Sequence, residues 1–218
     1  MYSSKYFDHL VVFTAGIGMF LSTLDSGIIN VALPTLSKSF NVTPSFITWS
    51  VTLYTLLLTG TIIIFGRLSD KYSRLNIYSL GLTTFLIASI LCGFSNSIMQ
   101  LIVFRGLQGI GAAMLQGTAT AIITTTIPED RQGPALGTLS ILLGIGPVLG
   151  PSIGGLLISI GNWRWIFWIN IPFIFIGLIG SLLLKKYIKE QKSASIHLDM
   201  RGLSLIHISE PTRPRLIS

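Results

Sequence analysis

The sequence predicts an all-α, polytopic membrane protein with six transmembrane helices. Half of the 218 residues are hydrophobic, only 11% are charged, and the mean hydropathy is +0.71. A typical soluble domain has about 25% charged residues. The apolar residues gather into six runs, each near the ~20 residues that cross a bilayer as a helix. These runs are 10–33, 46–65, 76–94, 98–123, 135–160 and 165–184.

The first run follows Lys5 near the N-terminus, as the apolar part of a signal peptide would. It exceeds the ~7–15 apolar residues of a signal peptide, and no small-residue cleavage site follows it. We therefore expect a first helix that is retained.

Basic residues lie unevenly in the connections between the runs. The N-terminal side holds Lys5, Arg67, Lys71, Arg74, Arg131, Lys185, Lys186, Lys189 and Lys192, and the other side holds Lys38 and Arg164. Cytoplasmic connections of membrane proteins are enriched in Lys and Arg, so the N-terminus is predicted to be cytoplasmic. Tryptophans favour the headgroup region, and those at the opposite ends of the runs agree: Trp49, Trp163, Trp165 and Trp168. The net charge of +7 therefore indicates topology and a lipid bilayer as partner, and no nucleic-acid partner is expected.

The fifth run contains the segment LGIGPVLGPSIGGLL at residues 143–157. Gly146, Gly150 and Gly154 recur every fourth residue, which places them on one helix face and lets another backbone approach closely. Pro147 and Pro151 each remove a backbone donor and are expected to bend the helix. The segment predicts a bent helix with a smooth face, which serves either as general packing or as a hinge and seal.

Two ionisable residues lie well inside predicted spans. Asp25 precedes the outer end of the first run by eight residues, and Arg105 follows the outer end of the fourth run by seven. At ~1.5 Å per residue both lie about 10–12 Å below the same surface, so we expect them to face each other across a cavity. Charges at such depth are functional candidates, while a purely structural ion pair is the alternative.

Four segments in order resemble motifs of the major facilitator superfamily, in particular its drug:proton antiporters with fourteen spans. They are LDSGIINVALP (24–34), GRLSDKYSR (66–74), RGLQGIGAA (105–113) and GPVLGPSIGG (146–155). The stretch WRWIF at 163–167, with Asn170 and Pro172, is similar to the start of the family's sixth helix. The resemblance covers roughly residues 8–203 and implies that the six helices form the N-terminal half of a twelve- or fourteen-span fold.

The resemblance implies a secondary active exporter of lipophilic or cationic compounds, driven by protons, in a bacterial plasma membrane. The proton and substrate pathway would include Asp25, Asn30, Arg105 and Gln108. The cytoplasmic gate would include Gly66, Arg67, Asp70 and Arg74. The antiporter helix would include Gly146, Pro147, Gly150, Pro151, Gly154 and Gly155, with the glycine face sealing against the opposite half.

In this interpretation Asp25 would exchange a proton as its cavity alternates between wet and dry states. Arg105 keeps its own proton, so it would tune Asp25 or hold water. The charged loop around Asp70 is either a gate or only a topology signal.

No catalytic constellation, cofactor motif or metal-ligand cluster is visible, and the glycines near Gly109 lack the context of a dinucleotide site. We expect no enzymatic activity; the alternative to transport is a membrane sensor or assembly partner that retains half the fold.

Some positions depart from the family pattern. Ser73 stands where the loop motif usually has glycine and Leu75 where a basic residue is common, so we expect a looser, less charged turn. The predicted domains are a transmembrane half at 1–190, a cytoplasmic linker at 191–203 and a non-native tail at 204–218. The tail, SLIHISEPTRPRLIS, resembles translated sequencing-adapter sequence, with a native tail as the alternative.

Overall fold

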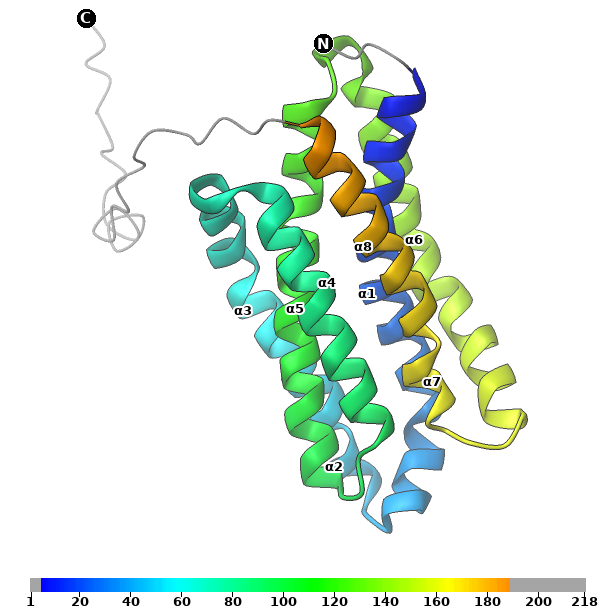
Figure 1. Cartoon of the computed structure of the whole chain (residues 1–218). Helices are drawn as coiled ribbons and strands as arrows, with labels where there is room; N and C mark the ends of the chain where they lie inside the picture. Colours follow the sequence, from blue (N-terminus) through cyan, green and yellow to red (C-terminus); the bar gives the residue numbers. More distant parts are fainter. Residues whose placement is uncertain (1–4, 189–218) are drawn as a thin grey trace, which may run out of the picture.

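Six long apolar segments stand side by side in the computed structural model, which describes residues 5–188 (Figure 1). The helices are α1 (Lys5–Phe40), α2 (Pro44–Ile47), α3 (Trp49–Tyr72), α4 (Arg74–Gly93), α5 (Ile98–Thr126), α6 (Glu129–Ser159), α7 (Trp165–Trp168) and α8 (Asn170–Tyr187). The short helices α2 and α7 lead into α3 and α8, so all six predicted spans are confirmed. Most helices extend past the apolar runs, because a helix continues into the membrane interface where polar side chains are hydrated. The predicted linker and tail lie outside the described residues.

The connections fall into two groups at opposite ends of the bundle (Figure 1). The connections after α1, α4 and α6 lie at one end, with α2 and α7. Those after α3 and α5 lie at the other end, with the start of α1 and the end of α8. The predicted grouping of the connections is therefore confirmed, while their orientation in the membrane stays a prediction.

The glycines of α5 allow close helix packing on two sides. A Cβ at Gly111 would lie 2.8 Å from the Phe85 backbone nitrogen of α4, and one at Gly117 would lie 2.8 Å from the Ile62 carbonyl of α3. Such distances are shorter than real Cβ contacts. Two backbones thus approach α5 where it lacks side chains.

The glycine face of α6 packs against α1. A Cβ at Gly150 would lie 2.5 Å from the Cα of Gly27, and one at Gly154 would lie 3.1 Å from the Ile28 carbonyl. A Cβ at Gly146 would lie 2.7 Å from the Leu24 backbone nitrogen. The smooth face is confirmed, but the expectation that it seals against the opposite half is wrong, because α1 of the same half already covers it.

The other face of α6 is open. Pro151 is exposed, and a Cβ at Gly155 would have no atom of a described residue within 4 Å. The helix remains continuous through Pro134, Pro147 and Pro151. Two residues predicted to act with the glycine face therefore lie outside its interface.

The connection between α3 and α4 keeps a conformation that favours glycine. Ser73 has a φ of 101°, in the region that side chains rarely adopt. Its Oγ accepts a hydrogen bond of 3.3 Å from the Asn76 backbone nitrogen and so caps α4. The expectation of a looser turn is wrong, since serine takes the glycine-type backbone here. Leu75 is buried in the core, which explains an apolar residue at this position.

Candidate functional site

An ion pair joins α1 to α5 inside the bundle. The Nη1 of Arg105 donates a hydrogen bond to Oδ2 of Asp25, and the two residues are 0% and 2% exposed. The prediction that these residues face each other is confirmed. The expected cavity between them is wrong, because the two side chains are in direct contact and buried.

Gln108 closes a triangle with this ion pair. Its Oε1 accepts from Nη1 of Arg105 at 2.7 Å, and its Nε2 donates to Oδ1 of Asp25 at 3.0 Å. The three-residue spacing puts Arg105 and Gln108 on one face of α5. The same Nε2 also lies 3.0 Å from Oγ of Ser89, so α4 takes part in the site.

Asn170 brings a further helix to the carboxylate. Its Nδ2 donates to Oδ1 of Asp25 at 3.2 Å, and the residue is fully buried at the start of α8. Asn170 lies in the motif at the start of the sixth span, but it was not among the residues predicted for the site. A polar amide within an apolar run was the available signal, since buried polar groups need partners.

The ring of Tyr54 in α3 packs against the guanidinium of Arg105. The guanidinium carbon lies 4.2 Å from the centre of the tyrosine ring, a cation–π contact. The hydroxyl donates to the Ser22 carbonyl of α1 at 2.9 Å. Sequence reasoning missed Tyr54 and Ser89, because an aromatic or hydroxyl residue in an apolar run does not show which way it faces.

We call Asp25, Ser89, Arg105, Gln108 and Asn170, with the ring of Tyr54, the polar cluster. All three groups that donate to Asp25 belong to it, and each suits an ionised carboxylate, which only accepts hydrogen bonds. Within the polar cluster, three buried polar atoms have no hydrogen-bond partner among the described residues: Nε and Nη2 of Arg105 and Oδ1 of Asn170. The cluster can therefore hold a charge and retains unused hydrogen-bonding capacity.

Asn30 is not part of the cluster. Its side chain is exposed on α1, and no hydrogen bond joins it to another residue in the part of the chain that the structure describes. Of the four residues predicted for the pathway, the structure thus brings three together.

The predicted gate residues meet only in part. Nη2 of Arg74 lies 2.6 Å from Oδ1 of Asp70, across the end of α3 and the start of α4. Arg67 is exposed and makes no ion pair with another residue of the range 5–188, while Gly66 lies on the side of α3 that meets Gly117 of α5. The structure supports a contact between the two helix ends and leaves a gating role untested.

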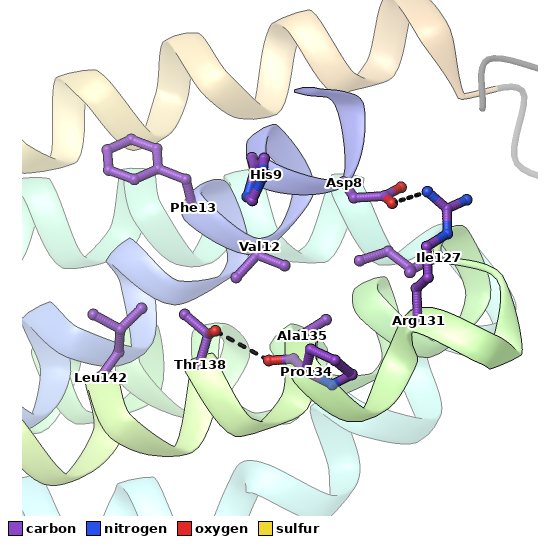
Figure 2. A pocket seen from close by; sticks show the side chains of 10 residues that line it. All are labelled: Asp8, His9, Val12, Phe13, Ile127, Arg131, Pro134, Ala135, Thr138 and Leu142. Atoms are coloured by element: carbon purple, nitrogen blue, oxygen red, sulfur yellow. Dashed lines mark hydrogen bonds and ion pairs between the residues drawn. The ribbon is translucent and has the colours of Figure 1, made fainter. Parts of the chain in front are cut away.

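A second ion pair at this end joins Arg131 of α6 to Asp8 of α1. It borders a cavity of about 550 Å³ between the two helices, with Phe13, Thr138 and Leu142 further along its walls (Figure 2). Sequence reasoning counted Arg131 as a topology signal and did not link it to Asp8, because they are 123 residues apart. None of the residues predicted for the pathway or gate lines this cavity.

Comparison with known proteins agrees with the membrane fold. The family model described as Major Facilitator Superfamily matches residues 15–217. The riboflavin transporter RibZ of Clostridioides difficile is 38% identical over 197 residues, 90% of this chain and 43% of that protein. The multidrug transporter protein MdtP of Bacillus subtilis is 34% identical, over 86% of this chain and 34% of that protein. The multidrug resistance protein Stp of Mycobacterium tuberculosis is 36% identical, over 83% and 33%.

The fold also resembles a solved structure. A bacterial homolog of the human lysosomal transporter Spinster, inward-facing and unoccupied, superposes with a TM-score of 0.68 at 22% identity. The match covers 93% of this chain and 47% of that one. This chain therefore spans less than half the length of the relatives it matches, and its six helices correspond to half of such a fold.

Proposed function

Because the chain belongs to the major facilitator superfamily, a family of transporters rather than enzymes, we propose that it forms the N-terminal half of a proton-coupled exporter of lipophilic or cationic compounds. The observation that carries this proposal is the polar cluster, in which a carboxylate is held by donors from two other helices. A carboxylate at membrane depth is costly to place and marks proton pathways in transporters.

Proton exchange at Asp25 would change the contacts between helices. A protonated Asp25 no longer attracts Arg105 as an ion, so the link between α1 and α5 weakens. Arg105 retains its proton throughout and serves as the counter-ion, which makes Asp25 the group that carries the proton.

The substrate class rests on the relatives. MdtP and Stp, by their names, act on multiple drugs, and from them we infer lipophilic or cationic substrates. Riboflavin is a second candidate, since RibZ is 38% identical to this chain. Competition between a fluorescent cationic dye and riboflavin for export would separate the two.

The cytoplasmic end supplies the proposed gate. Asp70 and Arg74 tie the ends of α3 and α4 together, and we propose that this contact forms and breaks as the transporter changes state, with Gly66 and Arg67 beside it. The antiporter helix α6 would move together with α1.

The N-terminus would be cytoplasmic in a bacterial plasma membrane. An impermeant thiol reagent should then label Lys38→Cys from outside and Lys186→Cys only after the membrane is opened.

The deciding experiment uses the complete transporter in proteoliposomes. A proton gradient should drive dye accumulation, and an uncoupler should abolish it. Asp25→Asn keeps the shape of the side chain but cannot exchange a proton, so proton-driven export should be lost. Asp130→Asn is the matched control, because Asp130 is an exposed carboxylate at the start of α6 and should leave export unchanged. Proton-driven export by Asp25→Asn would contradict the assigned proton site. Absence of any export by the complete protein would favour the sensor or assembly alternative.

A further inference from the structure

The side-chain amide of Asn170 is placed to respond to the protonation state of Asp25. We propose that this amide turns over when Asp25 takes up a proton, so that α8 stays bound to α1 in both states while Arg105 loses its ion pair. The inference rests on the proposed function in one respect, namely that Asp25 binds and releases a proton. It makes Asn170 a positioning residue.

The described arrangement suits only the ionised carboxylate. Oδ2 of Asp25 accepts from Arg105, and Oδ1 accepts from Gln108 at 3.0 Å and from Asn170 at 3.2 Å. Since all these partners donate, a protonated Asp25 would bring its own O–H into a ring of donors. The neutral acid therefore needs an acceptor.

The possible acceptors differ in whether they are already used. Oε1 of Gln108 accepts from Arg105 at 2.7 Å, and Oγ of Ser89 accepts from Gln108 at 3.0 Å. Oδ1 of Asn170 is buried and has no hydrogen-bond partner among residues 5–188. It is on the same amide that already touches the carboxylate, so it is the nearest unused acceptor within the polar cluster.

Turning this amide disturbs little else. Rotation about the bond between Cβ and Cγ exchanges the nitrogen and oxygen positions, and this terminal torsion is broad and roughly two-fold. The hydrogen bond to Asp25 is the one that Nδ2 makes with a described residue. After the turn, Oδ1 accepts from the Asp25 acid, and the contact between α8 and α1 is kept.

Gln108 cannot make the same exchange as easily. Its Nε2 donates to both Asp25 and Ser89, and its Oε1 accepts from Arg105. Since Sγ of Cys92 also donates to Oε1 at 3.9 Å, a turn of the Gln108 amide would disturb contacts with four residues. The unused acceptor therefore distinguishes Asn170 from the other amide of the polar cluster.

The same proton has the opposite effect on Arg105. The titratable groups that interact with Asp25 electrostatically are Arg105 of α5, Tyr54 of α3 and Cys92 of α4. Of these, Arg105 forms the ion pair, and its Nε and Nη2 already lack hydrogen-bond partners in the part of the chain that the structure describes. Neutralisation of Asp25 leaves the guanidinium with Gln108 and the Tyr54 ring. Protonation thus loosens α1 from α5 and leaves α8 attached.

Infrared difference spectroscopy of the complete transporter in lipid nanodiscs tests the inference directly. The protein carries asparagine with a ¹³C-labelled side-chain carbonyl, and spectra are compared at high and low pH without substrate. Acidification should produce a carboxylic-acid band that is absent in Asp25→Asn. At the same pH, one labelled amide band should move to lower frequency, because its carbonyl begins to accept a hydrogen bond. That band should be missing in Asn170→Leu and kept in Asn162→Leu, a matched change at an exposed asparagine.

A second variant covers the case in which Asn170→Leu does not fold. Asn170→Asp has nearly the same shape and places two carboxyl groups in one buried site, where they share a proton. The pH midpoint of the acid band should rise by about one unit or more. An unchanged midpoint would show that the side chain at position 170 does not contact the Asp25 carboxyl group, which overturns the inference.

The outcomes separate this inference from the proposed function. An acid band at Asp25 with no shift of the amide band overturns the amide turn and leaves proton coupling intact. Proton-driven export without an acid band from Asp25 also contradicts the turn of the amide. In that case the proton is carried by a group other than Asp25. If the acid band appears and the amide band shifts in a protein that exports nothing, the turn of the amide is supported and the transport function is contradicted.

Discussion

Helix α1 is held on two sides by different physical means. Asp25 binds α5 and α8 through charge and hydrogen bonds, whereas Gly27, two residues on, lets the backbone of α6 come close. Two residues on a helix are about 200° apart, so these contacts lie on nearly opposite faces. One interface depends on the ionisation of a carboxylate, while Gly27 and the glycines that it meets have no titratable group.

The two sides of α1 differ in how a proton affects them. A proton can alter the contact between α1 and α5, because that contact contains an ion pair. No change of charge alters the fit of Gly27 against Gly150, since this fit is steric. We therefore expect α1 and α6 to move as one unit and proton-dependent movement to occur on the side of the polar cluster.

The largest effect is expected from Arg105→Met. This change leaves the buried Asp25 without its counter-ion and should lower the free energy of unfolding by about 3–5 kcal/mol. Steric-trapping measurements on the complete protein in lipid would give the value. The double variant with Asp25→Asn should recover part of the loss, because no uncompensated charge remains. Arg74→Met removes a partly exposed pair and should cost at most about 1 kcal/mol. Equal costs at Arg105 and Arg74 would remove the distinction between a buried and a surface charge.

Gly150→Leu tests the steric side of α1. Its Cβ would lie 2.5 Å from the Cα of Gly27, so α6 must move away, and the free energy of unfolding should fall by about 3 kcal/mol. Gly155→Leu makes the same substitution on the same helix where a Cβ meets nothing within 4 Å. Thermal melts of both purified variants check the contrast. If the two variants melt alike, close approach of α1 and α6 is not what holds them together.

Substitutions at Tyr54 test the polar cluster on the other side of α1. Tyr54→Phe removes the 2.9 Å hydrogen bond to the Ser22 carbonyl but keeps the ring beneath Arg105, and it should cost about 1 kcal/mol. Tyr54→Leu also removes the cation–π contact, so its cost should be larger. The unfolding free energies of the two variants separate the contribution of the hydroxyl group from that of the ring. A Leu variant no weaker than the Phe variant would show that the ring contributes nothing to holding Arg105.

The smallest effect on stability is expected from Pro151→Ala, on the exposed side of α6. Alanine restores the backbone N–H that proline lacks and leaves the glycine face unchanged, so the free energy of unfolding should fall by no more than about 0.5 kcal/mol. Export is nevertheless expected to fall several-fold, because Pro151 shapes the face of α6 that α1 leaves uncovered. Efflux normalised to membrane-inserted protein measures this. Normal efflux would assign Pro151 no role beyond tolerated helix geometry.

Composition and spacing were enough to predict the six helices and the meeting of Asp25 with Arg105. A run of about 20 apolar residues has few alternatives to a transmembrane helix, because lipid supplies no hydrogen bonds to the backbone. Depth along a helix follows from counting residues at a fixed rise, so two charges at equal depth are natural partners. The glycine spacing likewise predicted a smooth face on the fifth span.

Only the tertiary structure decided which surfaces meet. The sequence placed the glycine face of α6 against the opposite half, but this face packs on α1. Asn30 lies on an exposed part of α1, outside the polar cluster, and its place in the pathway stays a prediction. Asn170, Ser89 and Tyr54 come from three other helices to form the polar cluster. The rotation of each helix about its axis is set by side chains far away in the chain. Hydrogen bonds and close backbone contacts act over a few ångströms. Which residues become partners is therefore decided only once the rotation of each helix is fixed.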